Sequence, residues 1–212
     1  MDRGEVFEER KIECLILKEI EKARILGKNF ETNEILTTTP ISRDFLERFL
    51  SKLLERNYVS YDGRNWTLTE KGRKRIKVGL MGGVFDIIHL GHIAALREAK
   101  KLCDLLVIVV ARDSVVKSLK GRYPVNSEKK RLEIIKSLKF VDLAILGDEK
   151  DFSKPVKHIK PDLIILGHDQ KIPPGALSGI EDIRVIKLNL YLEGESTSSI
   201  LQKIKDFVKE KP

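Results

Sequence analysis

The chain has 212 residues, of which 42% are hydrophobic and 34% are charged, and its formal net charge is +8. This composition supports a packed core and excludes a collagen-like or disordered chain. No run approaches the ~20 apolar residues of a membrane-spanning helix, and the start is polar rather than basic and then apolar like a signal peptide. We therefore expect a cytoplasmic protein without membrane contact.

The two cysteines, Cys14 and Cys103, lie in apolar runs and form no CxxC pair, so we expect both to be buried free thiols. The positive charge is spread along the chain, with one local basic cluster. This cluster is compatible with a phosphate-binding patch and equally with a solvated helix end or linker. Its members are Lys71, Arg73, Lys74, Arg75 and Lys77.

Residues 1–75 are expected to form a small helical domain that ends in a β-hairpin. Apolar residues recur every three or four positions over 7–26 and over 41–56, which predicts two amphipathic helices with a short helix at 32–36 between them. Alternation around Asp62-Gly63 predicts the hairpin. The inward positions of the third helix are Phe45, Leu46, Phe49, Leu50, Leu53 and Leu54.

Three helices followed by a hairpin resemble a winged helix-turn-helix domain. In that family the third helix usually enters the major groove of DNA and the hairpin contacts the backbone, which would make DNA a partner. The outer face of the third helix carries Arg43 and Arg48, but Asp44 and Glu47 lie beside them. Packing or dimerisation is therefore an equal alternative, and a homodimer is a possible assembly.

Residues 76–212 change to the pattern of an α/β domain. Continuously apolar runs at 77–83, 105–111, 141–147, 161–167 and 182–189 predict strands, and helical patterns separate them. This alternation predicts a doubly wound parallel sheet with helices on both faces and ligands at the carboxyl ends of the strands.

The end of the first of these strands carries the most informative residues. Gly82 and Gly83 allow the backbone to approach a ligand, and the amides at the start of the following helix form an anion site. His89 and His92 lie at the same helix start, so we expect phosphate as the ligand. A metal site is the competing interpretation, but two histidines without a third ligand are weak for zinc, and we expect no protein ligands for a metal.

The segment His89-Leu90-Gly91-His92, preceded by Gly83-Val84-Phe85-Asp86, resembles the nucleotidyltransferase superfamily with an HxGH motif. The resemblance implies that His89 and His92 stabilise charge on the α-phosphate of a nucleotide while a phosphorylated acceptor attacks and pyrophosphate leaves, with Mg²⁺ as divalent cation. Val84 stands where the family often has Thr. The nucleotide-binding residues that it implies here are Gly83, Val84, Phe85, His89, Gly91 and His92.

Three later segments extend the resemblance. Residues 111–124 imply a catalytic lysine that contacts the phosphates, with Lys120 the first choice and Lys117 the second, although each could be a plain surface lysine. Asp169 resembles the aspartate of the family's Gly-x-Asp, which binds the base or ribose. The last helix begins with a run of hydroxyls that resembles the family's Ser/Thr-rich phosphate-binding motif, where an ordinary N-cap needs only one. This run is Ser196, Thr197, Ser198 and Ser199.

Within the superfamily, residues 76–208 look most like the archaeal-type FAD synthases, which transfer AMP from ATP to FMN and release pyrophosphate. On that resemblance Tyr191 would lie near the nucleotide. Residues 172–183 match no pattern and could shape a different acceptor pocket.

Two alternatives stay open. The first is a cytidylyl- or adenylyltransferase that acts on a polyol or sugar phosphate, since one sequence does not settle ATP against CTP. Glu193-Gly194-Glu195 stands where glycerol-phosphate cytidylyltransferases have an arginine, which counts against a glycerol phosphate acceptor. The second is a DNA-binding regulator with a nucleotide-sensing domain, although a sensor need not keep His92 and Lys120 aimed at an α-phosphate.

Overall fold

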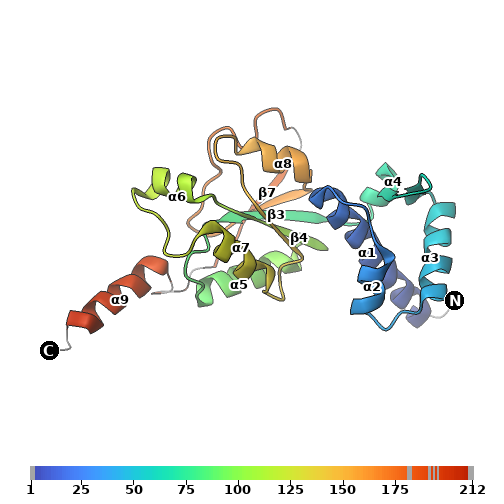
Figure 1. Ribbon diagram of the computed structural model, residues 1–212, viewed down its shortest axis with the longest axis horizontal. Coiled ribbons are helices and arrows are strands. Elements are labelled where there is room, and N and C mark those ends of the chain that lie inside the picture. The colour runs from blue at the N-terminus through green and yellow to red at the C-terminus, as the bar shows by residue number, and fades with distance from the viewer. Residues whose placement is uncertain (1–2, 181–182, 191, 193, 195, 210–212) are drawn as a thin grey trace. The chain divides into compact units, whose positions relative to one another are not determined.

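The computed structural model describes residues 3–180, 183–190, 192, 194 and 196–209, with side chains from residue 8 onward. The chain forms two compact units, Met1–Lys77 and Val78–Pro212, which we call the N-terminal and C-terminal units (Figure 1). Among the described helices, none is both long enough and apolar enough to cross a bilayer.

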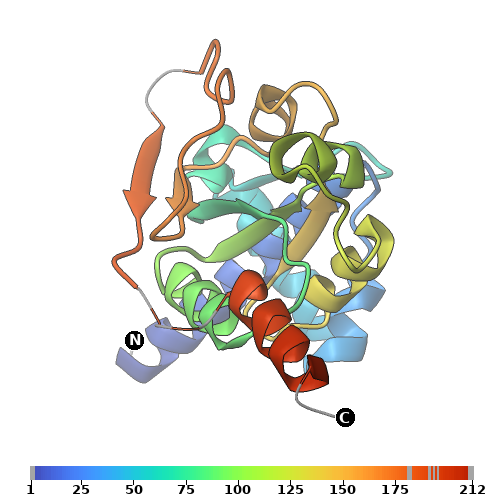
Figure 2. The same ribbon diagram turned by 90° about the vertical axis from the view of Figure 1, so that its left-hand side faces the viewer.

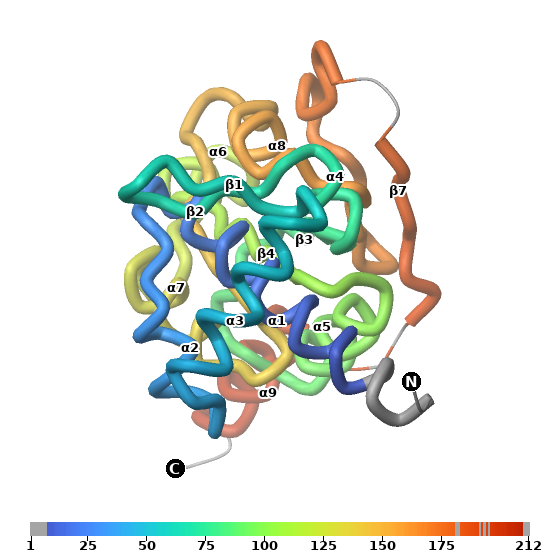
Figure 3. The backbone as a smooth tube through the Cα atoms, turned by 90° about the vertical axis from the view of Figure 1, so that its right-hand side faces the viewer, coloured from blue at the N-terminus to red at the C-terminus, as the bar shows by residue number. Residues whose placement is uncertain are grey.

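The N-terminal unit contains the predicted helices and hairpin. In α1 the apolar stripe buries Ile16, Leu17 and Ile20, and α3 is capped by Ser42, whose hydroxyl accepts a hydrogen bond from the Phe45 amide. The two strands pair antiparallel across the Asp62-Gly63 turn. The elements, traced in Figure 3, are α1 (Arg3–Leu26), α2 (Thr32–Thr38), α3 (Arg43–Glu55), β1 (Val59–Tyr61), β2 (Trp66–Leu68) and α4 (Glu70–Arg73).

One predicted core position of α3 is wrong. Leu46, Phe49, Leu50 and Leu53 are buried, but Leu54 is 45% exposed. Leu53 already fills the last inward position of the stripe, so Leu54 falls on its flank, one residue before the helix ends.

The basic cluster is partly used inside the N-terminal unit. Two carboxylates of α1, Glu13 and Glu21, are almost fully buried. Arg75 Nε lies 2.7 Å from a Glu13 oxygen, and Arg73 Nε lies 3.4 Å from Glu21, which also pairs with Arg24. The Glu13 carboxylate holds the pKa of Arg75 above its usual value. These arginines therefore compensate buried charge instead of forming a free phosphate-binding patch.

The C-terminal unit is built on a five-stranded parallel sheet with the strand order β5-β4-β3-β6-β7. Its elements are β3 (Val78–Gly83), α5 (Leu90–Lys101), β4 (Leu105–Val110), α6 (Asp113–Lys120), α7 (Glu128–Lys136), β5 (Leu143–Leu146), α8 (Ser153–Ile159), β6 (Leu163–Leu166), β7 (Arg184–Lys187) and α9 (Thr197–Lys209).

Helices cover both faces of this sheet, which confirms the predicted doubly wound architecture. Figure 1 shows α5 and α7 on one face and α6 and α8 on the other, and Figure 2 shows β7 at an edge. The core includes Met81 from β3, Leu96 from α5 and Ile135 from α7. The first strand of the unit, β3, lies in the centre, so the strand order reverses between β3 and β6 and leaves a ligand crevice at their carboxyl ends.

Both cysteines are free thiols, but they are half-buried and not fully buried as expected. Burial raises the pKa of the Cys103 thiol to about 11, so it is a poor nucleophile at neutral pH.

Candidate active site

A cavity of about 730 Å³ lies at the carboxyl ends of the central strands. It brings together every predicted site residue except Tyr191, which lies outside the described residues. The predicted residues that line it are Gly83, Val84, Phe85, His89, Gly91, His92, Lys120, Asp169, Ser196, Thr197, Ser198 and Ser199.

The turn after β3 folds back over its own glycine. Phe85 has a φ of +52°, in the left-handed region that costs a non-glycine residue about 1–2 kcal/mol. Its ring is buried and lies above Gly83, where an added Cβ would come within 2.7 Å of the ring. A glycine at position 83 is therefore required for this turn, which aims the chain into α5.

The two histidines of the HxGH segment pack against each other at the start of α5. The centroids of the His89 and His92 rings are 3.9 Å apart, and those of the Phe85 and His92 rings are 5.3 Å apart. Within the described part of the chain, the buried His92 Nδ1 lacks a well-formed hydrogen bond, and the Ile87 backbone acts on the ring only weakly. A buried donor or acceptor of this kind suits a ligand that would satisfy it.

His92 is neutral at pH 7 in the structure. Burial, helped by the neighbouring His89 and the Lys120 cation and opposed by the Asp169 carboxylate, lowers the pKa of its imidazole to about 4. A negatively charged phosphate in the cavity would act in the opposite direction, because it favours the protonated ring.

The structure separates the two candidate lysines. Lys120, at the end of α6, lines the cavity and acts electrostatically on His92. Lys117 is not among the described residues that line the cavity. Its ammonium donates a hydrogen bond to the Gly121 carbonyl oxygen at 3.0 Å and lies over the Tyr123 ring. This arrangement favours Lys120 for contact with a phosphate.

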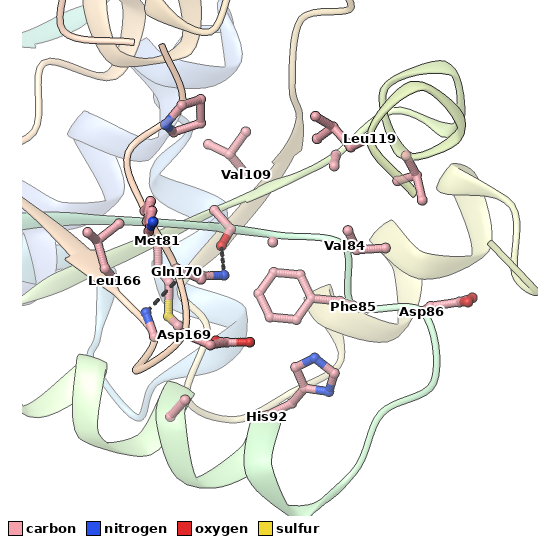
Figure 4. Close-up of a pocket in the computed structure, with 18 of the residues that line it drawn as sticks. Met81, Val84, Phe85, Asp86, His92, Val109, Leu119, Leu166, Asp169 and Gln170 are labelled. Atoms are coloured by element: carbon pink, nitrogen blue, oxygen red, sulfur yellow. Dashed lines mark hydrogen bonds between the residues drawn. The ribbon is translucent and has the colours of Figure 1, made fainter. Parts of the chain in front are cut away.

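At the end of β6 the exposed Asp169 carboxylate lines the cavity, and the next residue holds the loop in place. Gln170 accepts a hydrogen bond from the Gly167 amide at 2.9 Å and donates one to the Gly82 carbonyl oxygen at 3.0 Å (Figure 4). Gln170 thus bridges β6 and β3 across the crevice. No local pattern indicates this bridging role, because Gly82 lies 88 residues away in the chain.

The four hydroxyl residues at the start of α9 fall into two groups, of which one forms the N-cap of the helix. Ser196 Oγ accepts a hydrogen bond from the Ser199 amide at 3.0 Å and lies 2.8 Å from the Ser199 hydroxyl, so Ser196 acts as the N-cap. Thr197 and Ser198 also line the cavity. The N-cap interpretation therefore accounts for the hydroxyls of Ser196 and Ser199 and leaves those of Thr197 and Ser198 to be explained.

Arg131 ties together the loops beneath the site and was missed by sequence reasoning. Its fully buried guanidinium donates to the carbonyl oxygens of Val84, Ala111 and Asn126, and pairs with the Asp113 carboxylate at 2.7 Å. Its spacing of four from the buried Ile135 on α7 was the available signal, since that spacing places it on the inward face of the helix.

Asp86 fixes a second loop to the β3–α5 turn. Its buried carboxylate accepts hydrogen bonds from the Val125 and Asn126 amides, each at 2.9 Å. The side-chain amide of Asn126 returns a hydrogen bond to the Asp86 carbonyl oxygen. The turn that carries Phe85 and the histidines is therefore held rigidly from both sides of Asp86.

Residues 80–210 match the family model described as Cytidylyltransferase-like. A protein named FAD synthase from Thermoplasma volcanium is 45% identical over 137 residues, which cover 61% of this chain and 94% of that protein. A second protein named FAD synthase, from Thermoplasma acidophilum, is 46% identical over 127 residues, 57% of this chain and 88% of that protein.

A solved structure supports the same relationship. The crystal structure titled lipopolysaccharide core biosynthesis protein from Thermoplasma volcanium GSS1 is 43% identical, with a TM-score of 0.51, and the match covers 55% of this chain and 99% of that one. The family match spans more than half of the chain and contains the cavity with its paired histidines. The chain therefore belongs to the cytidylyltransferase-like family.

Proposed function

We propose that the C-terminal unit is an FMN adenylyltransferase, which converts FMN and ATP into FAD and pyrophosphate. One observation carries this proposal: the chain shares 45% identity with a protein named FAD synthase across 94% of that protein's length. The paired histidines at the start of α5 supply a site that suits this chemistry.

In the proposed reaction the enzyme positions two phosphates and needs no covalent nucleophile. An oxygen of the FMN phosphate attacks the α-phosphorus of ATP, a new P–O bond forms, and the bond to the bridging oxygen breaks, so that pyrophosphate leaves with the electron pair. His89 and His92, with the free amides of α5, would donate hydrogen bonds to the charge that develops on the α-phosphate. Lys120 would neutralise part of this charge from α6.

The second half of the nucleotide site is proposed at the ends of β6 and α9. Asp169 would bind the ribose or base, and the hydroxyls of Thr197 and Ser198 with the α9 amides would bind phosphate oxygens. The backbone of Gly83, Val84, Phe85 and Gly91 would approach the triphosphate. The contact expected for Tyr191 stays a prediction.

We propose Mg²⁺ as the divalent cation, carried into the site by ATP. In the described ranges no three His, Cys, Asp or Glu side chains form a group that could hold a metal ion. A cation held here would therefore be bound mainly by the phosphate oxygens of ATP, as Mg²⁺ commonly is. When bound, Mg²⁺ would neutralise charge on the phosphates.

Pyrophosphate release tests the proposal. The purified protein would be incubated with Mg²⁺ and either ATP or CTP, crossed with FMN, glycerol 3-phosphate and a sugar 1-phosphate. We expect release only with ATP and FMN, together with formation of FAD. Release with CTP, or with a polyol or sugar phosphate, would show that the proposed nucleotide or acceptor is wrong. No release in any combination would favour the nucleotide-sensing regulator.

For the N-terminal unit we propose a winged helix domain over residues 1–75 that binds DNA through α3. Three helices followed by the β1–β2 hairpin support it, as do the exposed Arg43 and Arg48 on α3. A gel shift with the upstream DNA of its own gene, at stated salt, tests this proposal, and equal binding to random DNA would contradict it. We further propose that the protein is cytoplasmic and forms a homodimer. Sedimentation of the purified protein would test the dimer.

A further inference from the structure

The half of the cavity at the ends of β4 and β5 has apolar walls. Val109 of β4, Leu119 of α6 and Val156 of α8 line it, together with Phe152 at the start of α8. Leu119 is 72% exposed, although it lies beside a cavity. A large aliphatic side chain left open at a cavity wall is typical of a surface that a ligand covers. We call this half the α6–α8 chamber.

The opposite half of the cavity carries polar groups beside aliphatic ones such as Leu166, Leu188 and Leu190. Asp169 follows β6, and the hydroxyls of Thr197 and Ser198 stand at the start of α9. Figure 4 shows Leu119 and Val109 on one side of the Phe85 ring and Asp169 on the other. The cavity therefore offers two places of different polarity for the two substrates, one with mainly apolar walls and one where polar groups stand beside aliphatic ones.

His92 lies on the same side of the Phe85 ring as Asp169 in Figure 4. Both the Lys120 cation and the Asp169 carboxylate line the same cavity and act electrostatically on the His92 ring. Lys120 directly follows Leu119, and both side chains line the cavity. An acceptor whose phosphate lies at Lys120 would therefore have the Leu119 side chain within reach for the rest of its structure.

We propose that the α6–α8 chamber binds the isoalloxazine ring of FMN, while the nucleoside of ATP occupies the polar half. The inference rests on the proposed function. A tricyclic planar ring has two large faces to bury against Leu119 and Phe152, whereas a polyol or sugar phosphate has almost no apolar surface to bury. The chamber thus selects a flavin acceptor by the hydrophobic effect.

Truncation on the two sides of the cavity tests the assignment. Leu119→Ala and Leu119→Asp change an exposed side chain in the chamber, so both variants should fold. Ile172→Ala shortens a half-buried cavity residue in the segment after β6 and probes the half assigned to ATP. The matched control is Ile134→Ala on α7, whose side chain is exposed and does not line the cavity. Binding would be measured by the fluorescence anisotropy of FMN in the presence of Mg²⁺ and α,β-methylene ATP, whose bridge cannot be cleaved. The KM values for FMN and ATP would be measured separately.

Leu119→Ala is expected to raise both the Kd and the KM for FMN by about fivefold, from the lost apolar contact. Leu119→Asp should raise them more, and the KM for ATP should stay within about twofold in both variants. Ile172→Ala should leave the affinity for FMN unchanged.

The inference is overturned if the Leu119 variants bind FMN like the unaltered protein, or if Ile172→Ala is the variant that loses FMN affinity. Formation of FAD by the unaltered protein in the same assay would then leave the proposed function standing. If the unaltered protein neither binds FMN nor forms FAD, the proposed function fails and the chamber assignment fails with it.

Discussion

At the scale of single residues, His92 connects the geometry of the cavity to the proposed chemistry. His92→Asn keeps a polar side chain but removes the imidazole that faces the α-phosphate, so turnover should fall by a factor on the order of 10². Pyrophosphate release measures this loss, and circular dichroism checks that the fold is intact. His158→Asn, on the exposed side of α8, is the matched control. Equal turnover of the His92 variant and the control would remove His92 from the mechanism.

The lowered pKa of His92 also predicts a pH dependence of stability. The imidazole has a pKa of about 4 in the folded protein and an ordinary value of 6.5, so the unfolded chain binds more protons between these pH values. The contribution of His92 to the free energy of unfolding is therefore fully present above pH 6.5. It is lost as the pH drops toward 4, by about 3 kcal/mol in total.

Urea unfolding at pH 7 and pH 4.5, in the absence of nucleotide, measures this dependence. The His92→Asn variant serves as the reference, because it lacks the titrating ring. The part of the stability loss between pH 7 and pH 4.5 that comes from His92 should be absent from this variant. Identical pH profiles for the two proteins would show that the ring keeps its ordinary pKa.

At the scale of elements, the buried Arg131 holds the ends of β3 and β4 to the start of α7. Arg131→Met removes the guanidinium and leaves three carbonyl oxygens and the Asp113 carboxylate without this donor. We expect the C-terminal unit to lose about 3–5 kcal/mol of stability. Thermal unfolding, compared with the exposed Lys130→Met, measures the loss. A difference below about 1 kcal/mol between the two variants would mean that water replaces the guanidinium at little cost.

The regular elements were predictable from sequence, because they follow from local patterns. The apolar runs give all five parallel strands, and Asp62-Gly63 gives the hairpin. The contacts of Gln170 and Arg131 were not predictable in the same way, because they join segments far apart in the chain. Leu54 shows a smaller failure, since a helical stripe does not reveal which flank lacks a covering partner.

Candidate site residues are predictable where a reactive residue type stands at a predicted strand end or helix start. The paired histidines were assigned to the helix start by their positions after two glycines, and the structure places their rings 3.9 Å apart. The choice between Lys117 and Lys120 needed the structure, because the last turn of α6 and the loop after it determine which ammonium faces the cavity.

At the scale of the whole molecule, each unit has its own core, and this predicts separable unfolding. Trp66, the single tryptophan, stacks on Tyr61 in the N-terminal unit, so its fluorescence reports on that unit alone. ATP with Mg²⁺ should raise the unfolding midpoint of the C-terminal unit, followed by circular dichroism, and leave the Trp66 transition unchanged. Coincident transitions that shift together on adding ATP would instead indicate one cooperative unit.

The position of β7 bears on how the protein behaves when concentrated. An edge strand presents unpaired backbone groups that can recruit a strand from another molecule, which is a common start of aggregation. β7 begins with Arg184 and ends with Lys187, and both are exposed. Two copies that met along this edge would bring these cations together, so the charges act as gatekeepers that keep the sheet from continuing into a neighbour.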